Sequence, residues 1–179
     1  PSGTAGDFTY TITGVTDANG CSQPQTSAAL FSFRDVAATI SGTTAVCMGA
    51  TAPEITFIGS GWRSVAPYTF TYKINGGANL TATTVADKCI SIPAPTGVDG
   101  TFVYSLVSVA DASGCSFPAS GSATITVYPP PVITGNNSDC YNDVGIVYTT
   151  EPGMTGYTWT ITGGTITAGA GTNSVTVNW

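Results

Sequence analysis

The chain has 179 residues, of which 42% are hydrophobic and only 8% are charged. With 4 basic side chains against 10 acidic ones, the formal net charge is −6, so no basic surface is available to release counterions from nucleic-acid phosphates. The hydrophobic share suffices for a packed core, and no apolar run reaches the 18 residues that would span a membrane. We therefore expect a folded chain with no nucleic-acid partner and no membrane insertion.

The sequence of residues 6–33 predicts a β-hairpin that occurs twice in the chain. They align without a gap with residues 100–127, and 11 of the 28 positions are identical, including the tips TDANGC and ADASGC. A second alignment joins residues 38–47 to residues 131–140 at an offset of 93. Two alignments with nearly the same period indicate a tandem array whose unit of about 94 residues has the size of an immunoglobulin-like sandwich.

This period predicts three segments. Residues 1–34 are the C-terminal strands of a truncated Ig-like repeat, residues 35–128 are a complete repeat, and residues 129–179 are the N-terminal part of a further Ig/PKD-like repeat. Apolar residues alternate with polar ones in the complete repeat, for example in YTFTYKI from Tyr68, which is typical of β-strands. We expect an all-β fold of tandem Greek-key sandwiches with no helices of note.

The last segment begins at three consecutive prolines, Pro129 to Pro131, which predict a semi-rigid hinge. Its expected strands include VGIVYTT and GYTWTITGG, and alternation in the second of these places Trp159 in the core of a sandwich.

The chain has five cysteines, and the repeat period relates four of them. Cys47 and Cys115 both fall in the complete repeat, so we expect a disulfide bond between them, which would imply an oxidising compartment. Cys21 matches Cys115 and Cys140 matches Cys47, so the partners of both are expected outside residues 1–179. Cys89 has no equivalent, and we expect it to be unpaired as well. The alternative is a set of buried free thiols.

Several runs are distinctive as a group: YTFTYKINGG, GTFVYSLVSVADASGC with its trailing GSATITV, and YTWTITGGTITAGAGTNSVTVNW. They resemble the Ig-like and PKD-like tandem repeats of giant Bacteroidota cell-surface adhesins, a family that includes gliding-motility adhesins and other cargo of the type IX secretion system. The resemblance implies an extracellular, cell-surface location and a role in adhesion, motility or spacing. The partners it implies are neighbouring repeats of the same chain, with surface glycans or other cell-surface and secretion proteins.

The residues that catalysis requires are largely missing. The chain has no histidine, which removes the usual general base and the commonest metal ligand. Its two glutamates, Glu54 and Glu151, fall in different predicted repeats, and Cys89 has no suitable base beside it. We expect no enzymatic activity and no cofactor.

Two loop features could bind a ligand. Asp139, Asn142 and Asp143 offer oxygen atoms that Ca²⁺ accepts, although Asp and Asn are equally typical of tight turns. Trp62 and Arg63, in GSGWRSVAP, could stack on a sugar or contact a partner protein, or Trp62 could pack against its own sandwich or the neighbouring one.

Three functions are compatible with these observations. The first is a non-catalytic segment of a long surface adhesin or fibre, acting as an extended stalk. The second is an Ig-like spacer array of a secreted multidomain enzyme, and the third is a carbohydrate-binding module.

Overall fold

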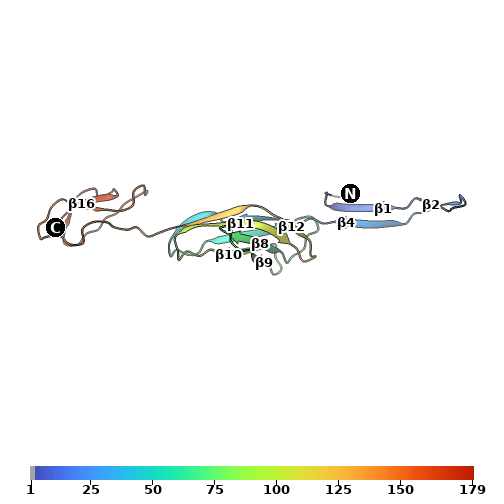
Figure 1. Ribbon diagram of the computed structural model, residues 1–179, viewed down its shortest axis with the longest axis horizontal. Helices are drawn as coiled ribbons and strands as arrows, with labels where there is room; N and C mark the ends of the chain where they lie inside the picture. The colour runs from blue at the N-terminus through green and yellow to red at the C-terminus, as the bar shows by residue number, and fades with distance from the viewer. Residues whose placement is uncertain (1–2) are drawn as a thin grey trace. The chain divides into compact units, whose positions relative to one another are not determined.

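The computed structural model describes residues 3–179, so the first two residues of the predicted segment 1–34 lie outside it. Within these residues the chain folds into sixteen β-strands, and it divides into two compact units, Pro1–Tyr128 and Pro129–Trp179 (Figure 1). The predicted all-β fold class is confirmed by these strands. No helix of the described residues is long and apolar enough to cross a membrane.

The first unit contains one long N-terminal hairpin followed by a sandwich. The hairpin strands are β1 (Gly6–Thr11), β2 (Gly14–Thr16), β3 (Ser22–Pro24) and β4 (Ala28–Phe33), and in this hairpin β1 pairs with β4 and β2 pairs with β3. The sandwich strands are β5 (Ala37–Ser41), β6 (Thr44–Cys47), β7 (Glu54–Ser60), β8 (Thr69–Ile74), β9 (Leu80–Thr83), β10 (Cys89–Pro93), β11 (Gly100–Ala110), β12 (Ser116–Pro118) and β13 (Ser122–Tyr128).

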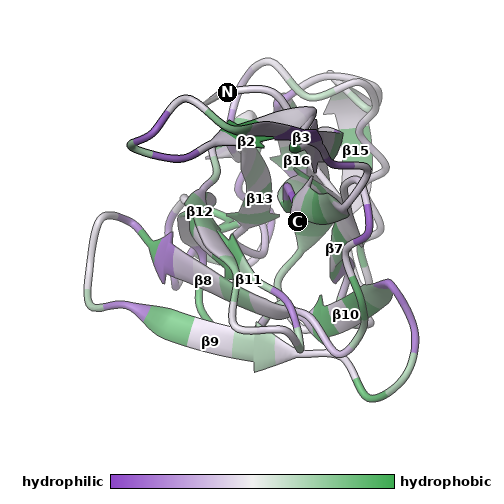
Figure 2. Ribbon diagram, turned by 90° about the vertical axis from the view of Figure 1, so that its right-hand side faces the viewer, coloured by the Kyte–Doolittle hydropathy of each residue, from purple (hydrophilic) through white to green (hydrophobic). Residues whose placement is uncertain are grey.

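The sandwich has two antiparallel sheets with one parallel pair at an edge. One sheet has the order β10-β7-β5, and the other has the order β6-β13-β11-β8-β9, with β12 also paired to β11 (Figure 2). The chain passes from the first sheet to the second between β5 and β6, where Gly42 has a φ of +118° and a Cβ would collide with the Glu54 carbonyl oxygen. β6 then pairs in parallel with β13. This Greek-key arrangement is that of an immunoglobulin-like sandwich.

The alternation of apolar and polar residues correctly predicts which side chains are buried in the core. In β8 and the residue before it, Tyr68, Phe70 and Tyr72 are buried, and the intervening threonines are more exposed. Phe57 of the opposite sheet packs against two of these rings, with centroid distances of 5.5 Å to Phe70 and 5.1 Å to Tyr72. Each buried aromatic side chain contributes about 1.5–3 kcal/mol through removal of apolar surface from water, so this cluster is a main source of the sandwich's stability.

The N-terminal hairpin repeats the register of the last hairpin of the sandwich. β1 pairs with β4 from Gly6–Phe33 to Thr11–Ala28, and β11 pairs with β13 from Gly100–Val127 to Ser105–Ser122. β2 and β3 likewise match the pairing of β11 with β12. All of these pairs are related by the same offset of 94 residues, so the sequence similarity between the two segments extends to their backbone geometry.

The second unit contains β14 (Ile146–Thr149), β15 (Thr165–Ala168) and β16 (Ser174–Asn178) in the order β14-β16-β15. An isolated bridge joins Thr134 to Thr149, and it corresponds at an offset of 93 to the Ser41–Thr56 pair of β5 and β7. The unit therefore begins like the first sheet of the sandwich.

One strand prediction in the second unit is wrong. The segment GYTWTITGG, residues 156–164, is not in a strand. It resembles β8, which pairs with β9 and β11 in the sandwich. The described part of the second unit supplies neither of these neighbours to it, and alternation alone cannot create a strand without a hydrogen-bonded partner.

Replacing Phe57 by Ala should lower the free energy of unfolding of the sandwich by about 3–5 kcal/mol, because it removes a fully buried ring and leaves a cavity. Urea unfolding of the full chain, followed by circular dichroism, measures the change. Ile58→Ala is the matched control, since Ile58 is the next residue of β7 and its side chain is exposed. Equal losses for the two variants would contradict this assignment of the core.

Candidate functional site

The loop that follows β7 is fastened to the linker between β4 and β5. The backbone N–H of Trp62 donates to the carboxylate of Asp35, and the N–H of Asp35 donates back to the Trp62 carbonyl oxygen at 3.4 Å. Gly61 has a φ of +130°, and a Cβ there would collide with the Asp35 carbonyl oxygen. The close approach thus requires glycine, and it fixes where Trp62 and Arg63 lie.

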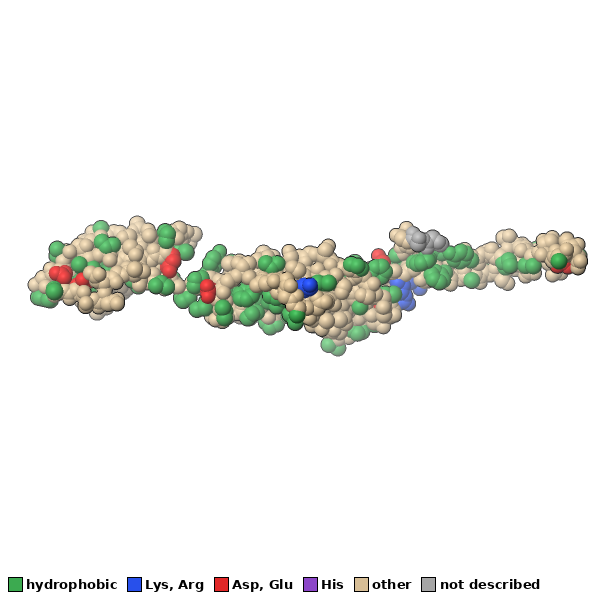
Figure 3. All heavy atoms as spheres, in the orientation of Figure 1, with side chains coloured by type: hydrophobic (Ala, Val, Ile, Leu, Met, Phe, Trp, Pro, Cys, Tyr) green, Lys and Arg blue, Asp and Glu red, His purple; other side chains and the backbone are tan. Residues whose placement is uncertain are grey.

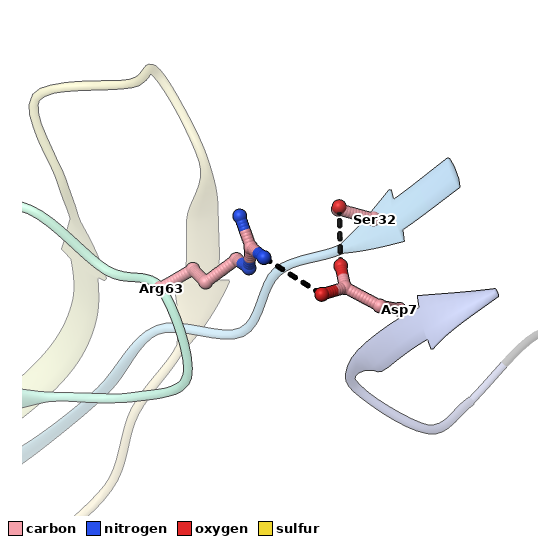
Figure 4. A network of polar contacts seen from close by, with 3 residues as sticks. All are labelled: Asp7, Ser32 and Arg63. Carbon is pink, nitrogen blue, oxygen red and sulfur yellow. Dashed lines mark hydrogen bonds and ion pairs between the residues drawn. The ribbon is translucent and has the colours of Figure 1, made fainter. Parts of the chain in front are cut away.

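Arg63 connects this loop to the N-terminal hairpin. Its guanidinium donates to the Asp7 carboxylate at 2.7 Å, and the Ser32 hydroxyl donates to the other oxygen of the same carboxylate at 2.5 Å (Figure 4). Both charged side chains are partly exposed, and exposed ion pairs contribute little to stability because water screens them. The contact therefore orients the loop on the hairpin more than it stabilises the fold.

The two residues predicted as a ligand contact are also in contact with each other. The Arg63 guanidinium carbon lies 4.8 Å from the centroid of the Trp62 ring, within the range of a cation–π interaction. The Trp62 side chain is 38% exposed. One face of the ring is thus occupied by the chain's own arginine, so a sugar stacking on that face would have to displace it. Sequence patterns gave no signal for Asp7, Asp35 or Ser32, because their roles depend on contacts between distant segments.

The two similar hairpin tips share one hydrogen-bond pattern. The Asp111 carboxylate accepts hydrogen bonds from the N–H groups of Ser113 and Cys115, as the Asp17 carboxylate does from Asn19 and Cys21. Asp111 also accepts from the Ser113 hydroxyl and from the N–H of Val65. Asp111 is buried, whereas Asp17 is exposed. These contacts are those of a side-chain-stabilised turn.

The predicted calcium candidates also serve as turn residues. Asp143 accepts a hydrogen bond from the N–H of Cys140 at 2.7 Å, and Asn142 has a φ of 70°. Asp139 accepts from the Asn136 side-chain amide at 2.9 Å and from the Tyr148 hydroxyl at 3.3 Å. Among residues 3–179, no three or more acidic, cysteine or histidine side chains are grouped as metal ligands. In the structure, the carboxylates of Asp139 and Asp143 therefore accept local hydrogen bonds.

The predicted disulfide bond is wrong, because its two cysteines lie at opposite ends of one sheet. Cys47 pairs with Tyr128, next to the Gly100 end of β11, whereas Cys115 follows the hairpin tip at the Ala110 end. At about 3.3 Å per residue the ten steps along β11 separate them by roughly 30 Å, and a disulfide requires Cα atoms within about 7 Å. All five cysteines are free thiols in the structure, and Cys115 packs partly buried against the core.

The second unit contains an apolar cavity that the sequence did not reveal. Its volume is about 380 Å³. Trp159 lies at its wall, and the Trp159 ring N–H donates to the Thr172 carbonyl oxygen at 2.8 Å, which fixes the ring. The other apolar walls come from Ile133, Tyr148, Ile161, Ile166, Val175, Val177 and Trp179. Trp159 is thus only partly buried, at the edge of an incompletely filled core.

Comparison with known proteins finds a similarity that lies mostly in the second unit. The PKD-like domain family matches residues 126–179. Among solved structures, the chain is similar to the CARDB domain of a Pyrococcus furiosus protein, crystallised in complex with di-metal ions, with 18% sequence identity and a TM-score of 0.38. That similarity covers 56% of this chain and 98% of the other. No curated protein matches the chain.

Asp111→Ala should lower the free energy of unfolding of the sandwich by about 1–3 kcal/mol, because the partly buried N–H groups of Val65, Ser113 and Cys115 lose their acceptor. Burial acts to raise the pKa of Asp111, but the hydrogen bonds from Ser113, Val65 and Cys115 outweigh it and lower this pKa below its ordinary value. The stabilisation is then present above about pH 4 and is lost as the pH falls through the lowered value.

Urea unfolding between pH 2 and pH 6 measures this effect, and Asp17→Ala in the exposed hairpin is the matched control. A difference between wild type and Asp111→Ala that stays constant over the whole range would contradict the assignment.

The pKa of Asp7 should lie below its ordinary value, chiefly because of the Ser32 hydroxyl and to a smaller extent because of Arg63. We expect Ser32→Ala to raise the Asp7 pKa more than Arg63→Ala does, and high salt to weaken only the Arg63 contribution. NMR titration of the side-chain carboxyl measures all three. An Asp7 pKa that neither substitution changes would show that the network in Figure 4 does not form in solution.

Proposed function

We propose that this chain is a non-catalytic structural segment of a long bacterial cell-surface adhesin or fibre, in which Ig-like and PKD-like units follow one another as a stalk. The pairing of β1 with β4 recurs 94 residues later in β11 and β13, and the Ser41–Thr56 pair recurs 93 residues later as the Thr134–Thr149 bridge. These recurrences support the view that all three segments belong to one kind of repeating unit. The PKD-like match of residues 126–179 supports a structural, extracellular role. We also propose a role in gliding motility and export by type IX secretion, and this part rests on the resemblance of the sequence to the repeats of cell-surface adhesins.

The observation that carries the proposal is the parallel pairing of β6 with β13. These strands lie near the two ends of the sandwich, and they pair from Thr44–Ile125 to Cys47–Tyr128. The Met48 N–H extends the ladder by donating to the Tyr128 carbonyl oxygen at 2.8 Å. When the chain is pulled from both ends, parallel terminal strands slide along each other, so their hydrogen bonds must break together. Such a domain resists tension, as a stalk requires.

The alternatives are less well supported by the geometry. A carbohydrate-binding module needs exposed aromatic platforms, and the Trp62 ring already has Arg63 over one face. An Ig-like spacer of a secreted enzyme would use the same mechanical property, with the enzyme on other parts of the protein. We propose no reaction for the described residues themselves.

Single-molecule stretching of the full chain should show a cooperative unfolding step of the sandwich. Residues 37–128 at about 3.5 Å each give a length on the order of 300 Å, and this step should be the same with and without reductant because no bridge closes a loop. Met48→Pro should lower the unfolding force, since proline removes the N–H that bonds Tyr128.

Met48→Ala is the matched control, because it keeps the backbone donor and also shortens an exposed side chain. Equal forces for wild type and Met48→Pro would argue against a load-bearing role of the β6–β13 pair. A step that lengthens on adding reductant would contradict the free state of the cysteines.

A further inference from the structure

The turn after β8 contains an Asn-Gly step whose conformation suits both residues. Asn75 and Gly76 have positive φ values of 49° and 70°, and the Gly77 N–H donates to the Ile74 carbonyl oxygen at 2.9 Å. This is a type I′ turn, which favours Asn followed by Gly because both residues adopt positive φ readily. The turn lies between β8 and β9, well inside the sandwich.

The side chain of Asn75 extends the ladder between β8 and β11 past the end of β8. The Asn75 backbone N–H donates to the Val103 carbonyl oxygen at 2.9 Å, and the Val103 N–H donates to the Asn75 side-chain oxygen at 2.8 Å. The side-chain NH₂ group donates to the Thr101 carbonyl oxygen at 3.1 Å. The amide of Asn75 thus takes the place of a peptide group where the backbone turns away from β11, and its two hydrogen bonds form a clamp between the turn and that strand.

Hydrogen bonds rather than burial hold this amide. Asn75, Gly76 and Thr101 are all exposed, and a Cβ at Gly76 would meet no atom within 4 Å. Water therefore reaches the turn, and the clamp alone fixes the side chain. The amide is released whenever the turn separates from β11 by local opening.

The same step is chemically labile, because glycine has no side chain to hinder the approach of its own nitrogen. When the amide is free, the Gly76 nitrogen attacks Cγ of Asn75. The new N–C bond closes a succinimide ring, the Cγ–Nδ2 bond breaks, and ammonia leaves with the proton of the Gly76 N–H. Water then opens the ring at either carbonyl, which gives aspartate or isoaspartate at this position.

We infer that Asn75 is a modification site of the sandwich, whose conversion to aspartate or isoaspartate is blocked while the clamp is closed and proceeds when the turn opens. Attack moves Cγ onto the Gly76 nitrogen and so pulls the amide away from Val103 and Thr101, which means that the clamp must break first. The inference needs only the sandwich and goes beyond the proposed function, so either can fail without the other.

The reaction also removes the clamp that delays it. An aspartate at this position still accepts from the Val103 N–H but has no N–H for the Thr101 carbonyl oxygen, and its negative charge faces that oxygen instead. Isoaspartate in addition inserts a methylene into the main chain of a tight turn. A sandwich that has reacted should therefore open more easily, and the change is one-way because the ammonia is lost.

Incubation of the full chain in native buffer and in denaturing guanidinium chloride tests the inference. Conversion adds a negative charge to a chain of net charge −6, and charged side chains are sparse over the sandwich in Figure 3, so ion exchange separates the product. Peptide mapping in water labelled with heavy oxygen assigns the reaction to Asn75. The other Asn-Gly step, Asn19-Gly20, reports the rate of an unprotected step in the denatured sample.

Conversion of Asn75 should be at least about tenfold slower in native buffer than in the denaturant, because only the open fraction reacts. Equal rates in the two conditions, or no conversion of Asn75 in the denaturant while Asn19 reacts, would overturn the inference.

Asn75→Asp tests the clamp directly. It should raise the unfolding equilibrium constant of the sandwich about two- to tenfold in urea unfolding, as the loss of one hydrogen bond does. Asn79→Asp is the matched control, because Asn79 is exposed in the same loop and the substitution adds the same charge. Equal stability of the two variants would show that Asn75 does not clamp the turn to β11, and the inference would fall with it.

Discussion

The rest of this structure depends on the requirement that a β-strand has hydrogen-bonded neighbours and an apolar cover. β11 meets this requirement most fully, because it pairs with β8, β12 and β13 and places Tyr104, Leu106 and Val109 in the core. The N-terminal hairpin has the same internal ladder but no cover. The residues around Trp159 have an apolar sequence but no ladder. The three parts of the chain thus differ in how far their strands are paired and covered.

The secondary structure and the core could largely be predicted from the sequence, because both depend on local alternation. Tyr68, Phe70 and Tyr72 are buried as their period of two predicts. The prediction of strands was wrong for the segment around Trp159, where the presence of a hydrogen-bonded neighbour decides whether a strand forms. The segment around Trp159 alternates as clearly as β8, yet a strand forms only where a second strand is present. Local pattern is therefore necessary for a strand but does not suffice.

The contacts between distant segments could not be predicted for a related reason. Both cysteines of the expected bridge lie in strands or turns of the sandwich, but the direction of each strand puts Cys47 at one end of the sheet and Cys115 at the other. Similarly, Arg63 was conspicuous as a loop residue, while its partner Asp7 is 56 positions away in an ordinary strand. A repeat period shows which residues are equivalent, but the strand topology decides which residues meet.

The same strand topology is the basis of the mechanical role that we propose. In the sandwich the chain enters near β6 and leaves along β13, and these strands are parallel neighbours, so tension on the chain acts along their shared ladder. Because parallel strands slide along each other when the chain is pulled from both ends, the hydrogen bonds of this pair must break together before the sandwich unfolds.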